Sequence, residues 1–184
     1  MEAIFVKINF WLLLGATIIG LGLGVLLQDF NPFIPKPPIK EDIQTGKTVP
    51  DFAFTDLFGK DYNIKDLRGK TVLLNFWASW CPPCIIEFPD LVKRARNDEN
   101  IVFLAVSTDY RVENMEKFLA KQNLLKAPTE RIILVHDTDK TITQDLFQTY
   151  RLPETIIIND KGEMVEKIAG AIEWLDKELP TPSR

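Results

Sequence analysis

The feature that most constrains this chain is a pair of cysteines placed directly after the pattern of a buried strand. Residues 71–77 are dominated by apolar and β-branched side chains, and helical periodicity begins at about Pro83. Cys81 and Cys84 lie at this junction between strand and helix. The chain has no other cysteine and only one histidine, too few for a disulfide scaffold or for a structural zinc site without carboxylate ligands. We therefore interpret the two cysteines as one functional pair.

Strand and helix patterns alternate through the remainder of the chain, which predicts an α/β domain built on a parallel sheet. We expect strands at residues 51–55 and 62–64, flanking a turn at Gly59, and at residues 71–77, 101–107, 132–135, 155–159 and 164–168. Helices are predicted over residues 83–96, 112–122 and 143–150, with a terminal helix near Trp174. Five phenylalanines are assigned to the core rather than to a cofactor site: Phe52, Phe54, Phe103, Phe118 and Phe147.

The first 28 residues differ in composition from this domain. No charged residue occurs from Ile8 to Gln28, and a helix of these 21 residues would span roughly 30 Å, the thickness of a bilayer's hydrocarbon core. A cleaved signal peptide is the alternative, but no pair of small residues marks a cleavage site after Leu27. We predict a retained transmembrane anchor at 1–28, and Lys7 before it gives a weak bias towards a cytoplasmic N-terminus.

A proline-rich linker is predicted over residues 29–48, where four prolines fall between Pro32 and Pro38 and restrict the backbone. The folded domain then covers residues 49–178, and residues 179–184 form a tail. Lys and Arg number 22 against 26 Asp and Glu, a net charge of -4. A protein that binds the phosphate backbone of nucleic acids needs more basic than acidic residues, so nucleic acid is not an expected partner.

The position of the cysteines gives them different chemistry. Unpaired N–H groups and the helix dipole at the predicted helix start stabilise the thiolate of Cys81 and lower its pKa. Cys84, one turn along, can attack a mixed disulfide formed on Cys81. Pro82 and Pro83 lack N–H donors that could solvate the thiolate, and they preorganise the helix start. Two alternatives stay open, a stabilising disulfide and a Cys-Cys Cu(I) site.

The sequence block around the pair resembles the TlpA/ResA/CcmG family of membrane-anchored, thioredoxin-like thiol-disulfide reductases. The resemblance lies in Asp66-Leu67-Arg68-Gly69-Lys70, in Asn75 to Cys84, and in Glu87, and it extends over roughly residues 49–174. It implies a thioredoxin fold with a central mixed sheet flanked by helices and an N-terminal β-hairpin extension. It also implies that Cys81 is the exposed nucleophile, that Cys84 resolves, and that the domain lies outside the cytoplasm.

Glu87 matches the acidic residue that this family places beneath its active site. It stands one turn beyond Cys84 on the same helix face, where partial burial would raise its pKa towards that of the thiols. Asn75 occupies the position where thioredoxins usually carry a buried, proton-relaying Asp, and an amide cannot titrate. We therefore expect Glu87 to be the general acid/base, the alternative being a solvated helix glutamate.

Leu152-Pro153-Glu154-Thr155 resembles the family's cis-proline loop. Pro153 is expected to face the cysteines, with Leu152 turned towards the substrate backbone, and an ordinary trans proline is the alternative. Trp80 is the better candidate for an apolar rim that receives a client, because Trp77 can fill the core.

We interpret His136 as an exposed residue without a role.

These residues together predict an enzyme that reduces disulfides in client proteins at the periplasmic side of the inner membrane, with the chain crossing that membrane once. The resemblance implies apocytochrome c as a client and a membrane reductant of the DsbD/CcdA type as electron source. No small-molecule cofactor is required. A copper-delivery or cytochrome oxidase assembly factor, using the pair as ligand or reductant, is the second hypothesis, and a peroxide-reducing enzyme is a weaker third.

Overall fold

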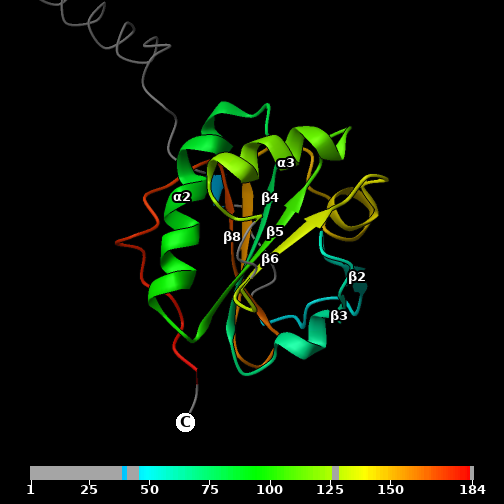
Figure 1. The fold of residues 1–184 in the computed structure, drawn as a ribbon. Coiled ribbons are helices and arrows are strands. Elements are labelled where there is room, and N and C mark those ends of the chain that lie inside the picture. Colours follow the sequence, from blue (N-terminus) through cyan, green and yellow to red (C-terminus); the bar gives the residue numbers. More distant parts are fainter. Residues whose placement is uncertain (1–38, 41–45, 126–128, 183–184) are drawn as a thin grey trace, which may run out of the picture. The chain divides into compact units, whose positions relative to one another are not determined.

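The core of the fold is a mixed sheet that carries the strands on either side of the cysteine motif. A computed structural model describes residues 39–40, 46–125 and 129–182. Within these residues six strands pair in the order β1-β8-β7-β4-β5-β6 (Figure 1). Strands β4, β5 and β6 run parallel, whereas β7 and β8 are antiparallel to their neighbours. Their bounds are β1 Ile39–Lys40, β4 Thr71–Trp77, β5 Ile101–Ser107, β6 Ile132–His136, β7 Glu154–Ile158 and β8 Met164–Ala169.

Alternate side chains of the central strand β4 enter two separate cores. Leu73 and Trp77 pack with helices α2 (Pro82–Asn97) and α3 (Val112–Lys121). Val72, Leu74 and Phe76, with the opposite parity, belong to the cluster on the other face of the sheet. This two-residue period also puts Asn75 on the same face as Leu73 and Trp77, the face that α2 covers. The mixed sheet flanked by helices that the family resemblance implied is therefore confirmed. The parallel sheet that the alternating pattern predicted is present only in β4, β5 and β6, because β7 and β8 run antiparallel to their neighbours.

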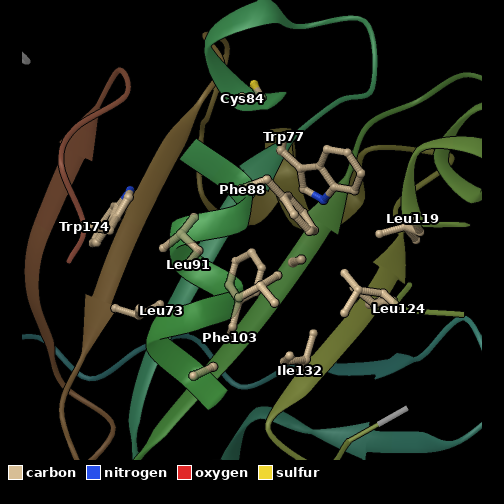
Figure 2. Packing of buried hydrophobic residues seen from close by; sticks show 14 of the residues in the cluster. Leu73, Trp77, Cys84, Phe88, Leu91, Phe103, Leu119, Leu124, Ile132 and Trp174 are labelled. Carbon is tan, nitrogen blue, oxygen red and sulfur yellow. The ribbon is translucent and has the colours of Figure 1, made fainter. Parts of the chain in front are cut away.

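The helix face of the sheet is rich in aromatic contacts around Phe88 of α2. Its ring centroid lies 4.5 Å from that of Trp77, 5.1 Å from that of Phe103 and 5.2 Å from that of Phe118. Figure 2 shows Phe88 beside Trp77 and Phe103, with Cys84 towards one end of the same cluster. The packing that holds α2 against the sheet thus begins immediately behind the cysteine motif. All five phenylalanines that the sequence assigned to the core are buried.

The predicted hairpin precedes the sheet as β2 (Ala53–Thr55) and β3 (Asp61–Asn63). Ile64, expected in the second strand, instead begins a 3-10 helix, η1 (Ile64–Leu67). The cause is a capping box: the Asn63 side chain accepts from the Lys65 N–H, and Asp66 accepts from the Asn63 N–H.

The terminal helix expected near Trp174 is absent from the described residues, so that prediction was wrong. The chain there follows an irregular path, and the Arg94 guanidinium donates to the carbonyls of Leu175 and Lys177. Thr71 likewise donates its hydroxyl to the Pro180 carbonyl. These tertiary bonds occupy carbonyls that a helix would use internally.

The helix expected at 143–150 is a short π-helical segment, η2 (Thr141–Leu146). Its start is fixed by the buried Asp137, which accepts from the N–H groups of Ile142 and Thr143 and from the Thr143 hydroxyl. Asp137 acts as a cap that the periodicity of the sequence does not show.

Part of the stretch that the sequence assigned to the linker pairs with the sheet. Ile39 and Lys40 add an edge strand to β8, and the Gly46 N–H donates to the Met164 carbonyl at 3.2 Å. The anchor predicted at 1–28 lies outside the described residues. Among the residues described, no helix is both long and apolar enough to cross a bilayer.

Candidate active site

Cys81 and Cys84 form a disulfide at the N-terminus of α2, with their Cα atoms 5.3 Å apart. Cys81 is the N-cap residue, and Pro82 and Pro83 occupy the first two helical positions. Cys81 is 4% exposed and Cys84 1% exposed. In this oxidised form Cys81 is therefore buried, whereas the family resemblance implied that it is exposed to solvent. The helix N-terminus still stabilises a thiolate formed on Cys81 when the disulfide is reduced.

The turn before Cys81 is tied to the neighbouring strand by a buried carboxylate. Asp109, just after β5, accepts from the Ser79 N–H at 2.9 Å, from the Ser79 hydroxyl at 2.7 Å and from the Ser107 hydroxyl at 2.7 Å. Because Ser79 lies two residues before Cys81, these bonds fix the chain that enters the active-site helix. Sequence reasoning missed Asp109, since its partner Ser79 lies 30 residues away.

His136 belongs to the same support and is not the exposed residue that the sequence suggested. The residue is half-buried, and its Nε2 lies 2.7 Å from the Asp109 carbonyl oxygen. Its Nδ1 lies 3.1 Å from the Thr138 hydroxyl. His136 therefore connects the end of β6 to the loop after β5.

Glu87 is buried on α2, one turn beyond Cys84, and is not a solvated helix glutamate. Its Oε2 accepts from the Trp174 indole N–H at 2.9 Å, and its Oε1 accepts from Asn75 Nδ2 at 3.0 Å. Burial raises the pKa of Glu87 to about 7, although hydrogen bonds from Trp174, Asn75 and the Ile172 backbone lower it in part. A carboxyl with that pKa can both accept and release a proton near neutral pH.

Asn75 links Glu87 to the strand that follows the proline loop. Its Nδ2 also donates to the Thr155 hydroxyl at 2.9 Å, and Asn75 and Thr155 are register partners in β4 and β7. Its Oδ1 is buried without a hydrogen-bond partner among the described residues. If the Asn75 side-chain amide rotates by a half turn, its Oδ1 faces Glu87 in place of Nδ2. In that orientation Asn75 can accept a hydrogen bond from the protonated Glu87 carboxyl.

The Leu152–Pro153 peptide bond is cis, as the resemblance to the family's cis-proline loop implied. Leu152 lines a groove of about 480 Å³ together with Trp80, Cys81, Pro82 and Pro83. The structure thus brings all the predicted substrate-contacting residues except Pro153 to one groove beside the reactive sulfur. Trp80 is 59% exposed, whereas Trp77 is fully buried in the core.

The acid after the cis-proline is buried and has two side-chain partners. Glu154 accepts a hydrogen bond from the Thr149 hydroxyl, and its Oε1 lies 2.9 Å from Lys167 Nζ. This pair joins β7 to β8 next to the proline loop. The roles of Trp174, Thr155, Asp109 and Glu154 were not found from the sequence. Trp174, Thr155 and Asp109 act through Glu87, Asn75 and Ser79, each 30 or more residues away, whereas Glu154 bonds to Thr149 only five residues earlier.

No group of three or more His, Cys, Asp or Glu side chains in the described part of the chain is arranged to hold a metal ion. What the geometry provides is a vicinal cysteine pair, a buried acid behind it and a groove in front of it. A mixed sheet with a helix that opens on such a pair defines a thioredoxin-like thiol-disulfide oxidoreductase.

Comparison with known proteins gives the same class. The Redoxin family profile matches residues 44–179, so the chain belongs to the Redoxin family. It is 33% identical over 135 residues to the thiol-disulfide oxidoreductase ResA of Bacillus subtilis (strain 168), covering 72% of each chain. It is 37% identical over 139 residues to the ResA of Bacillus anthracis, covering 71% of this chain and 73% of that one.

A solved structure described as a putative thiol:disulfide interchange protein DsbE from Chlorobium tepidum superposes with a TM-score of 0.59 at 27% identity. The match covers 70% of this chain and 86% of that one. These likenesses support the TlpA/ResA/CcmG resemblance, and the protein is a disulfide reductase that acts on disulfide-containing clients.

Proposed function

We propose that this protein reduces disulfides of client proteins outside the cytoplasm, with apocytochrome c as the principal client. The observation that carries the proposal is the Cys81–Cys84 pair at the start of α2 with the buried Glu87 behind it. The groove beside Cys81 is open, so it suits a segment of a protein chain better than a small molecule that must be enclosed. The cycle uses only the two sulfurs and Glu87, so we propose that no further cofactor takes part.

The reductive half of the cycle starts from the Cys81 thiolate and the Cys84 thiol. Cys81 attacks one sulfur of the client disulfide, a mixed disulfide forms, and the other client sulfur leaves as a thiolate. Cys84 then gives up its proton and attacks Cys81, which releases the second client thiolate and forms the Cys81–Cys84 disulfide. The client gains two electrons and, after protonation, two protons.

Glu87 serves this second step as the general base in our proposal. Its raised pKa of about 7 suits transfer of the proton that Cys84 loses, directly or through one water. Trp174 and Asn75 are positioning residues, because they bond to the Glu87 carboxyl and not to a sulfur. Trp80 and Leu152 contact the client chain beside Cys81.

The cellular setting is also part of the proposal. Residues 1–28 form a retained anchor that crosses the inner membrane once, and the folded domain lies on the periplasmic side. A membrane reductant of the DsbD/CcdA type restores the dithiol by the reverse exchange. A phosphatase reporter fused after residue 184 should be active only if the C-terminus lies outside the cytoplasm.

The direct experiment uses the full chain in detergent, reduced with dithiothreitol and then desalted. Mixed with oxidised apocytochrome c, it should transfer two electrons per protein and expose two client thiols, and Cys81→Ser should transfer none. A protein that leaves the client oxidised, or whose pair is as oxidising as DsbA at about -120 mV, would defeat the proposal. Stoichiometric Cu(I) binding without turnover would favour the copper-delivery alternative.

A further inference from the structure

The groove beside Cys81 has an uneven chemical lining. Besides the residues of the cysteine motif and Leu152, it is lined by Tyr110 from the loop after β5 and by Lys140 and Tyr150 around η2. The remaining lining residues are threonines and a glutamine. None of the described residues that line the groove is a carboxylate, although the chain as a whole has a net charge of -4. The groove is thus a locally cationic and aromatic surface on an acidic protein.

Aromatic side chains are concentrated there. Tyr110 is 78% exposed and Tyr150 73% exposed, and with Trp80 they are three of the four strongly exposed aromatic residues in the described chain. Large exposed aromatic side chains gathered around one concave site mark a recognition surface. Their flat faces suit an extended client segment that has aromatic or large aliphatic residues near its disulfide.

Lys140 supplies the positive charge of the groove lining, alone among the lining residues that the structure describes. It adopts φ of 62° at the start of η2, and its Nζ lies 4.7 Å from the ring centroid of Tyr110. This cation–π contact holds the ammonium group beside the groove instead of letting it move freely in solvent.

The two acids next to Lys140 in sequence are engaged elsewhere. Asp137 accepts from backbone and side-chain groups of Thr143, and Asp139 accepts from the N–H and hydroxyl of Thr141. Within residues 46–125 and 129–182, no carboxylate lies within ion-pair distance of Lys140 Nζ. The ammonium group is therefore available to a carboxylate brought by the client.

We propose that the groove selects client segments that carry an acidic residue within a few positions of the reactive cysteine, bound by Lys140, next to an aromatic or aliphatic residue bound by Trp80, Tyr110 and Tyr150. This inference rests on the proposed function, because it describes the client of the same reaction. Charge selection of this kind acts mainly on the rate of productive encounter and weakens with salt.

The test compares disulfide peptides that are identical except for one residue, Asp, Asn or Lys, two positions before or after the reactive cysteine. The reduced full chain in detergent should reduce the best Asp peptide about fivefold faster than its Lys counterpart, measured at low salt as the second-order rate constant of a single turnover, and the difference should shrink in 1 M salt. Lys140→Glu should reverse the order, Lys140→Arg should keep it, and Lys121→Glu, an exposed change outside the groove, should leave it as it is.

The outcomes distinguish a failure of the charge selection from a failure of the reductase function. Equal rates for the Asp and Lys peptides, or an unchanged order in Lys140→Glu, would overturn the charge selection and leave the function intact. Failure of the wild-type protein to reduce any of the peptides, or apocytochrome c itself, would count against the proposed function instead.

Discussion

Replacing Glu87 by Gln should remove a titration that destabilises the folded protein as the pH rises through neutrality. The folded-state pKa of Glu87 is raised to about 7 from an ordinary value of 4.5, mainly by burial. Below pH 4.5 the group is protonated in both the folded and the unfolded chain. Between pH 4.5 and 7 the unfolded chain loses the proton while the folded chain keeps it. The contribution of Glu87 to stability is therefore fully present in acid and is lost as the pH rises through 7.

The size of the effect follows from the difference between the two pKa values. A gap of roughly 2.5 at about 1.4 kcal/mol per pH unit amounts to about 3 kcal/mol. A Gln at this position does not titrate. Its carbonyl can accept from the Trp174 indole, and its NH₂ can donate to the otherwise unpartnered Asn75 Oδ1 after the Asn75 amide turns over.

The assay is denaturant unfolding of the oxidised, detergent-solubilised chain between about pH 4 and 8, with wild type, Glu87→Gln and Glu99→Gln compared at each pH. Glu99 is exposed and serves as the matched control. From the acidic to the alkaline end of this range, the free energy of unfolding of Glu87→Gln should rise by about 3 kcal/mol relative to that of wild type. The free energy of unfolding of Glu99→Gln should differ from that of wild type by a constant amount at every pH. If the wild-type and Glu87→Gln curves stay parallel, Glu87 has an ordinary pKa and its proposed role in proton transfer fails.

Three further substitutions test other parts of the site. Trp174→Phe removes a donor to the ionised Glu87 and should raise the pH midpoint of that carboxyl by about one unit, seen by infrared spectroscopy, whereas an unmoved midpoint would show that the indole bond is unimportant. Asp109→Ala leaves the buried Ser107 hydroxyl and the half-buried Ser79 hydroxyl without their acceptor and should cost about 3 kcal/mol of unfolding free energy, a cost that Asp90→Ala at a half-buried position of α2 should not show. Phe88→Ala opens a cavity among Trp77, Phe103 and Phe118 and should cost about 3 to 5 kcal/mol, and a loss below about 1 kcal/mol would contradict the packing described.

The elements predicted well from the sequence are those whose structure is determined by their own side chains rather than by distant partners. Strands β4 and β5 have the predicted bounds because they are continuous apolar runs buried on both faces. The start of α2 was within one residue, since Pro82 and Pro83 fix the backbone there. The cis bond at Pro153 was predicted from the resemblance of its loop, not from local physics.

Features decided by distant partners were missed. Near Trp174 the chain is irregular because Arg94 and Glu87 of α2 bind its carbonyls and its indole, and no local pattern reports this. His136 looked like an isolated surface residue because its partner, the Asp109 carbonyl, lies 27 residues earlier. Glu87 could be proposed from its place one turn after Cys84, but the donors that surround its carboxyl come from β4 and from the irregular segment after β8.

The central claim is that Cys81 is the sulfur that attacks the client and Cys84 the one that releases it. The most direct measurement traps the intermediate: the reduced, full-length Cys84→Ser and Cys81→Ser variants are each mixed with oxidised apocytochrome c, and the adducts are mapped by mass spectrometry. A stable mixed disulfide on Cys81 in the Cys84→Ser variant, with no adduct on Cys84 in the Cys81→Ser variant, is the expected result. An adduct on Cys84 alone, or none on either cysteine, would contradict this assignment.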